Sequence, residues 1–329
     1  MVTESSLRQH PAVSKALMGV PAEAVWALIA HIKEQLPAYE EQRLERADRQ
    51  RALGGGRDFD QPLVIRVALV LTYLRLHIAQ EAVAQLYGAT QSDGSREWRR
   101  LRPVLQAALP CPAVWQQLAA GADLSPKQCL ELEQWADRRA LIDATEQRVA
   151  RPTERTTRKE HYAGKKSFPL KTQLVTDGES HMLALSEAGP GKMHDKKLSA
   201  HLQTVERLPD GCEADADTGS QGLAAQVCLV TVTDPETGAE QQVPRLAVKT
   251  PFKKPQGQEL TQDQQAFNTH LSQVRVRIEH CIGWVKNWAI IATRFRCAHT
   301  IYTAILRTIC GLVNAQTQRW QAAKAANCA

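Results

Sequence analysis

The chain has 329 residues, of which 43% are hydrophobic and 23% are charged, and its formal net charge is +6. This length allows two or three domains with their own cores, and the composition is that of an ordinary soluble protein. The N-terminus shows no signal pattern, and the longest apolar stretch, residues 63–76, contains two arginines and is too short to span a bilayer. We therefore expect a cytoplasmic protein with no membrane partner, and the mildly basic charge permits a polyanionic one.

The cysteines are scattered along the chain. No CxxC pair occurs, and no His/Cys grouping has the spacing of zinc ligands. This pattern favours reduced thiols in a reducing compartment, and argues against a zinc site or a disulfide framework.

The first third of the chain carries helical patterns. Apolar residues at helical spacing predict a helix over 21–50, and the stretch GGGR at 54–57 then indicates a hinge. We place an N-terminal helical segment at residues 1–56. Three further helices are expected between residues 61 and 109, with a proline near the first start and Gly88 as a C-terminal cap.

Two short helices joined by a tight turn, the second rich in arginine, are typical of a helix-turn-helix that binds DNA. The second helix, QSDGSREWRRLRPVLQAAL, would offer Arg96, Arg99 and Arg100 to DNA. Many helical domains share this pattern, and Gly94 inside the helix costs up to about 1 kcal/mol relative to alanine. We assign residues 57–135 to a helix-turn-helix DNA-binding region.

From residue 136 the pattern changes to short apolar or alternating strands, mixed with helices. Strands are expected in ALIDATEQRV, PLKTQLVTD, HMLALSEAG and CEADADTG, followed by a strand pair and two long helices. This order predicts an α/β catalytic domain with a mixed sheet over residues 136–329.

Positive charge is concentrated in residues 148–171, which contain eight Lys or Arg and two acids. Such a run is either a solvated loop or a surface that contacts phosphates. The candidate DNA-binding residues of this segment are Arg151, Arg155, Lys159, Lys165 and Lys166.

Three acids stand at positions that suggest chemistry. Asp143 interrupts an apolar run, where an unpaired buried carboxylate would cost several kcal/mol. Asp217 ends a later strand before a glycine turn, and Asp215, two residues earlier on the same strand face, is its rival. Glu279 lies on a predicted helix, and Arg275 and Lys286 lie on the same face of that helix. This arrangement is either a surface Arg–Glu pair with a lysine nearby or a carboxylate flanked by cations in a site for a polyanion.

The hydrolysis of a phosphodiester is a reaction in which these three acids could act together. Two hard divalent ions about 3.5–4 Å apart would activate the attacking oxygen and stabilise the leaving one. Mg²⁺ takes oxygen ligands, usually a few carboxylates together with substrate phosphate. Two strand aspartates and one helix glutamate would form such a set, and bound metal would then offset the cost of burying Asp143.

Several motifs, in this order, resemble a DDE transposase of the insertion sequence 5 family. They are LIDATEQRVARP, YAGKKSFPLKTQLVTD, HDKKL, ADTGSQG, KTPFKKPQGQELT and RVRIEHCIGWVKNWAIIATRFR, and with the preceding helices they span about residues 60–315. The resemblance implies a ribonuclease H-like fold, preceded by an all-helical region with a helix-turn-helix. It implies that Asp143, Asp217 and Glu279 hold two Mg²⁺ ions, with Mn²⁺ as a substitute, and that Arg275 and Lys286 belong to the catalytic signature.

The resemblance also implies a function. A bacterial, nucleoid-associated transposase would bind the terminal inverted repeats of its element, cleave double-stranded DNA and join the ends to target DNA, as a dimer at least. Two positions depart from the family pattern: Ser272 replaces a tyrosine and Ser220 an aromatic residue. They leave open a catalytically decayed or regulatory DNA-binding protein, and a metal-dependent phosphatase or nuclease for small substrates is a third reading.

Overall fold

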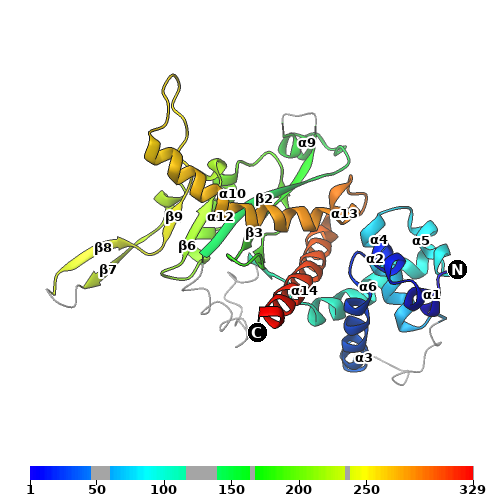
Figure 1. Ribbon diagram of the computed structural model, residues 1–329. Coiled ribbons are helices and arrows are strands. Elements are labelled where there is room, and N and C mark those ends of the chain that lie inside the picture. Colours follow the sequence, from blue (N-terminus) through cyan, green and yellow to red (C-terminus); the bar gives the residue numbers. More distant parts are fainter. Residues whose placement is uncertain (46–59, 116–138, 164–166, 234–237, 329) are drawn as a thin grey trace. The chain divides into compact units, whose positions relative to one another are not determined.

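The computed structural model describes residues 1–45, 60–115, 139–163, 167–233 and 238–328 (Figure 1). It divides into two compact units, which are described separately. Unit 1 comprises Met1–Cys111, Trp284–Arg294 and Ala304–Ala329, and unit 2 comprises Pro112–Gly283 and Phe295–Thr303. Within the described ranges no single helix is long and apolar enough to cross a membrane, although one bent pair, Pro11–Met18 with Ala22–Leu44, passes that test by length and composition.

Unit 1 begins with α1 (Glu4–Gln9), α2 (Pro11–Met18) and α3 (Ala22–Leu44). Helix α1 starts where the Thr3 hydroxyl accepts the Ser6 N–H, which satisfies a backbone donor that has no partner inside the helix. Helix α3 is the helix expected over 21–50, and it buries Val25, Leu28, Ile29 and Ile32 at the predicted spacing. The proposed hinge at 54–57 lies outside the described residues.

The three expected helices follow as α4 (Leu63–Leu76), α5 (Gln80–Leu86) and α6 (Gln91–Ala108). Gly88 adopts a left-handed φ of +68° just after α5, as its role as a cap requires. Gly94, expected only to weaken α6, is buried against α4, where a Cβ would lie 3.3 Å from Leu69 Cδ2. The absence of a side chain at Gly94 therefore lets α4 and α6 approach closely. The helix propensity of glycine does not reflect this packing contact.

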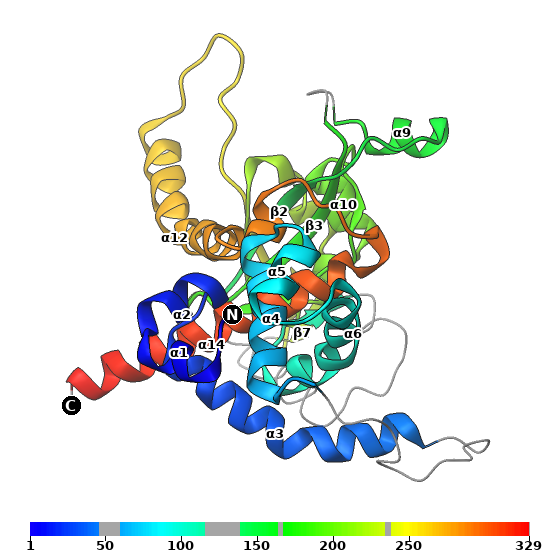
Figure 2. The same cartoon turned by 90° about the vertical axis from the view of Figure 1, so that its right-hand side faces the viewer.

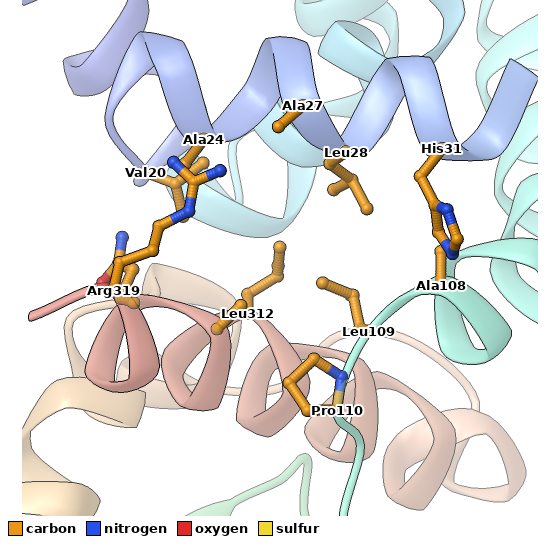
Figure 3. Close-up of a pocket in the computed structure, with 12 residues that line it drawn as sticks. Val20, Ala24, Ala27, Leu28, His31, Ala108, Leu109, Pro110, Leu312 and Arg319 are labelled. Carbon is orange, nitrogen blue, oxygen red and sulfur yellow. The ribbon is translucent and has the colours of Figure 1, made fainter. Parts of the chain in front are cut away.

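Helix α14 (Tyr302–Cys328) packs on the N-terminal helices of unit 1 over most of its length. The Gln106 amide donates to the Ala304 carbonyl at 2.9 Å, and the Asn314 amide donates to the Pro110 carbonyl at 2.9 Å. A pocket of about 170 Å³ lies between α3, the end of α6 and α14, with apolar walls and with His31 and Arg319 at its two ends (Figure 3). The three domains expected from the sequence stay a prediction, but Ala304–Ala329 groups with the N-terminal helices, not with residues 136–283.

Unit 2 is built on a seven-stranded mixed sheet, which confirms the predicted α/β class. The strands run in the order β1-β4-β3-β2-β6-β9, with β5 beside β3. Strand β2 pairs antiparallel with β3 and parallel with β6, and β6 pairs parallel with β9. The strands are β1 (Ala113–Val114), β2 (Arg139–Arg148), β3 (Pro169–Thr176), β4 (Met182–Leu185), β5 (Gly189–Pro190), β6 (Glu213–Ala216) and β9 (Ala247–Lys249).

The remaining elements of unit 2 surround this sheet or project from it. Strands β7 (Leu229–Thr233) and β8 (Glu240–Pro244) form a separate two-stranded hairpin. The helices are α9 (Arg155–His161), α10 (Asp195–His201), α11 (Thr204–Arg207) and α12 (Gln262–Lys286), whose last three residues belong to unit 1 together with α13 (Ala289–Ala292).

The two faces of the sheet have different surroundings. On one face Ala140 and Ile142 of β2 pack in a buried cluster with Val205 and Leu208, which come from α11 and the residue after it. Because side chains alternate along a strand, Leu141 and Asp143 point to the opposite face. Helix α12 reaches that side, since Arg275 of α12 pairs with Asp143. The site described below therefore lies between the sheet and α12.

A buried ion pair links α4 to α6 in unit 1. Arg66 Nε lies 2.7 Å from Glu97 Oε2, and the two side chains are only 5% and 12% exposed. Removing one partner of a buried pair leaves an uncompensated charge and typically costs about 3–5 kcal/mol. We expect Glu97→Ala to lower the local stability of α4 and α6 by about 3 kcal/mol, measured by amide hydrogen exchange.

The matched control replaces both partners, Arg66→Met with Glu97→Leu, so that no buried charge remains. This double variant is expected to lose less stability than Glu97→Ala alone. If the double variant loses as much stability as Arg66→Met and Glu97→Leu lose together when each is made alone, the pair does not couple the helices.

Candidate active site

Two of the three predicted acids meet because of the register between β2 and β6. These strands pair in parallel, with Ile142 opposite Ala216, so the next residues along the strands are Asp143 and Asp217. Asp217 is the first residue after β6 and precedes the short helical turn Thr218–Ser220. The sheet thus presents the two carboxylates side by side at the same level of adjacent strands.

A single guanidinium from α12 bridges the two carboxylates. Arg275 Nη1 lies 3.2 Å from Asp217 Oδ1, and Nη2 lies 3.6 Å from Asp143 Oδ2. The arginine side chain is 8% exposed, while those of Asp143 and Asp217 are 24% and 45% exposed. Because a guanidinium keeps its charge at any physiological pH, Arg275 supplies a permanent counterion for both acids.

Asp143 is the more perturbed of the two carboxylates. Burial raises the pKa of Asp143 to about 6, since removal from water penalises its charged form. Asp217 and Asp195 raise this pKa further by repulsion, while the N–H of Ala144 and the Arg275 guanidinium lower it. Burial therefore destabilises the charged form of Asp143, and an additional cation nearby would stabilise it.

The third acid is not assembled with the other two. Glu279 follows Arg275 by four residues, so the two lie on the same side of α12, and the Glu279 side chain is exposed. In the described part of the chain, no three His, Cys, Asp or Glu side chains are close enough to hold a metal ion together. Lys286, the other signature cation, is the last residue of α12 and belongs to unit 1.

A fourth carboxylate, Asp195 of the HDKKL motif, lies near the pair. It begins α10, and its Oδ1 lies 2.8 Å from Lys171 Nζ. Gly219, in the turn after Asp217, leaves room for this carboxylate, because a Cβ there would lie 2.6 Å from Asp195 Oδ2. The HDKKL motif and the glycine turn are the sequence features that mark this position.

Asp215, the rival to Asp217, has a different environment. Its side chain is 1% exposed and lies 3.4 Å from Arg139 Nε, with both carboxylate oxygens buried. Burial raises the pKa of Asp215, and the charges of Arg139 and Lys249 oppose that rise. Of the two aspartates, Asp217 is the one that shares a cation with Asp143.

The candidate DNA-binding arginines of α6 divide into two groups. The side chains of Arg96 and Arg99 are exposed, and within the described residues their hydrogen bonds go to their own helix, to Ser92, Asp93 and Ser95. Arg100 instead pairs with Glu40 of α3, with Nε 2.6 Å from Oε1. Arg100 therefore joins two helices of unit 1, a structural role that the sequence pattern did not indicate.

Part of the basic segment of unit 2 forms helix α9. Arg151, Arg155 and Lys159 are exposed there, whereas Lys165 and Lys166 lie outside the described residues. Arg158 donates to the carbonyls of Pro152 and Thr153 and so fixes the approach to α9. Lys171 is buried and bound to Asp195, so it is not available to a phosphate.

The raised pKa of Asp143 predicts how its removal changes stability with pH. In the unfolded chain an aspartate titrates near ~3.9, so the folded state binds the Asp143 proton more tightly than the unfolded state does. Charged Asp143 thus lowers the free energy of unfolding above about pH 6, and the loss disappears as the pH falls towards 4. We expect Asp143→Asn to stabilise the metal-free protein at pH 8 by roughly 2 kcal/mol and to have little effect at pH 4, measured by thermal unfolding in EDTA.

Glu213 on the neighbouring strand is the control of opposite sign. Hydrogen bonds from Arg139 and Lys249 lower its pKa, so its stabilisation is present near pH 7 and is lost as the pH falls through that lowered value. Glu213→Gln should therefore destabilise the protein at pH 7, and the effect should shrink as the pH falls below the usual pKa of a glutamate. Destabilisation of the metal-free protein by Asp143→Asn at pH 8 would contradict the assigned environment.

Comparison with known proteins agrees with this geometry. Residues 142–314, more than half of the chain, match the family described as DDE superfamily endonuclease. Over 177 residues the chain is 27% identical to a probable transposase for insertion sequence element IS702 from Microchaete diplosiphon. That match covers 53% of this chain and 55% of the relative, so the chain spans about half the length of the curated relative it matches. The family match includes Asp143, Asp217, Arg275 and Glu279, and the chain belongs to the DDE superfamily of endonucleases.

Proposed function

We propose that the protein is a transposase that binds the terminal inverted repeats of its element, cleaves there and transfers the ends to target DNA. The observation that carries the proposal is the pair Asp143–Asp217, held on adjacent parallel strands and bridged by Arg275, inside the segment that matches a DDE endonuclease. The similarity to an insertion-sequence transposase supports the choice of DNA as substrate. We further propose the insertion sequence 5 family and a ribonuclease H-like fold, with which the mixed sheet is consistent.

The acid pair fits a divalent metal ion, which members of this superfamily use. Both groups are oxygen donors, and burial raises the pKa of Asp143, so a cation bound there would stabilise its charged form. Asp143 and Asp217 would hold the ion, with Glu279 contributed from α12, and Mg²⁺ or Mn²⁺ suits such a set. The bound ions would lower the barrier by polarising the scissile phosphate and the attacking oxygen.

The chain's own residues prepare this site before any ion binds. Arg275 keeps the two like-charged carboxylates together, since without it they would repel one another. A guanidinium also binds phosphate oxygens well, so Arg275 can exchange a carboxylate for the DNA backbone when a cation shares the acids. Lys171 holds Asp195 at the edge of the site and limits its repulsion of Asp143.

Binding of the DNA ends would involve exposed arginines of both units. Helix α6 would serve as the recognition helix of a helix-turn-helix, with Arg96 and Arg99 towards DNA, and α9 would contact phosphates through Arg155 and Lys159. Synapsis of two ends would require at least a dimer. Such a protein would act in the bacterial cytoplasm, in association with the nucleoid.

Removal of single charges tests the acid site. Asp143→Asn, Asp217→Asn and Glu279→Gln keep the size of each side chain but remove an anionic ligand, so a hard cation should be bound more weakly. We expect each variant to fold and to bind DNA that carries the repeats flanking the reading frame. Nicking of that DNA in Mg²⁺ should fall by a factor of about a hundred or more, which corresponds to about 3 kcal/mol in the barrier.

Two matched variants control for charge and position. Asp263→Asn removes an exposed acid from the first turn of α12 and should cut like the parent. Asp215→Asn separates the two candidates for the second ligand, because loss of cutting there, with normal cutting by Asp217→Asn, would transfer the role to Asp215. Absence of Mg²⁺-dependent nicking by the parent itself, with normal binding of the ends, would favour a decayed or regulatory DNA-binding protein.

The role of α6 is tested by its exposed arginines. Arg96→Ala with Arg99→Ala should weaken binding to an end fragment and reduce the slope of log K against log salt by about one unit per lost phosphate contact. Lys33→Ala, which removes an exposed cation from α3 of the same unit, is the control and should change neither quantity. Equal slopes for the double variant and the parent across a salt titration would show that α6 does not contact DNA.

A further inference from the structure

The segment between β9 and α12 contains an exposed aromatic residue that the proposed site does not use. Residues 250–261 form a loop that projects from unit 2 at the N-terminal end of α12 (Figure 1; Figure 2). Phe252, near the start of this loop, is 46% exposed. A single exposed apolar side chain is common on protein surfaces, so the role of Phe252 depends on the contacts that hold it and on its charged neighbours.

Phe252 is held on both its backbone and its ring. Its N–H donates to Asn268 Oδ1 at 2.8 Å, and its carbonyl accepts from Asn268 Nδ2 at 2.9 Å. Its ring packs edge to face against Phe267, with the centroids 5.2 Å apart and an angle of 66° between the planes. Two adjacent residues of α12 therefore fix the aromatic ring in place and leave part of it open to solvent.

The same loop is connected to the acid site. Gln221, in the turn that follows Asp217, donates its amide to the Pro251 carbonyl at 3.1 Å. Along α12, Asn268 precedes Arg275 by seven residues, which corresponds to roughly 10 Å of helix.

The charges next to Phe252 favour a polyanion. Lys253 and Lys254 follow it directly and are exposed. Lys254 Nζ pairs with Glu259 at 2.5 Å, whereas no residue that the structure describes forms an ion pair with Lys253. An ordered aromatic face beside an available ammonium suits a base and its phosphate better than an apolar protein surface.

We propose that Phe252 stacks on an unpaired nucleobase of the bound DNA, while Lys253 contacts the adjoining phosphate. This inference rests on the proposed function, since it takes the same DNA as ligand. Bases inside a duplex are already stacked on both faces, so only a base at a tail, nick or frayed end can use this ring. Stacking needs no hydrogen bonds to base edges, so the contact is independent of sequence.

The test uses a 2-aminopurine base as a stacking probe. It compares a blunt duplex with the same duplex carrying a single-stranded tail that contains 2-aminopurine, both in EDTA so that no cutting occurs. The parent should quench the fluorescence and bind the tailed duplex about five- to a hundredfold more tightly than the blunt one, the range expected for one stacked base. Phe252→Trp should keep both effects.

Phe252→Leu should lose both effects, because leucine keeps apolar bulk but has no π face. Lys253→Gln should weaken binding to the tailed duplex and reduce its salt dependence, with quenching retained at saturation. Val276→Ala, at an exposed apolar residue of α12, is the control and should behave like the parent. Unchanged tail preference and quenching in a folded Phe252→Leu would overturn this inference alone, whereas a parent that binds neither duplex would overturn the proposed function as well.

Discussion

The parallel pairing of β2 with β6 is the constraint on which the candidate site depends. It sets Asp143 and Asp217 beside each other, and the alternation of side chains along β2 turns Asp143 away from the core cluster that takes Ala140 and Ile142. Two adjacent carboxylates in a partly buried position repel one another, and Arg275 is the group that makes the arrangement stable without metal. A shift of one residue in this register would send one of the aspartates into the core.

Local patterns in the sequence predicted most of the helices and strands described above and drew attention to the two strand carboxylates. An acid in the middle of an apolar strand indicated Asp143, and a strand followed by a glycine turn indicated Asp217. The helical spacing of Arg275 and Glu279 correctly put them on the same side of one helix. These features were accessible because each depends on residues within one or two turns, or within one strand.

The features that escaped prediction depend on contacts between distant segments. Burial of Gly94 against Leu69, the pairing of Arg100 with Glu40 and the approach of Asp195 to Gly219 each join different elements. The packing of Ala304–Ala329 with the N-terminal helices is a larger example. Spacing along one chain segment fixes which face a residue occupies, but not which element covers that face.

Helix α12 connects the parts of unit 2 that the proposed chemistry requires. Asn268 fixes the Phe252 loop, Arg275 joins the two strand carboxylates, and Glu279 stands on the same helix with its side chain exposed. The strand acids are held by the sheet, so bringing Glu279 to them requires a change in α12 or in its side chains, not in β2 or β6. Because the anchor of the loop and the bridging arginine are seven residues apart on one rigid helix, a movement of α12 along its axis changes both contacts together. In the proposed function, an ion bound at the acids and a base stacked on Phe252 would therefore be coupled through this helix, because Asn268, Arg275 and Glu279 all belong to it.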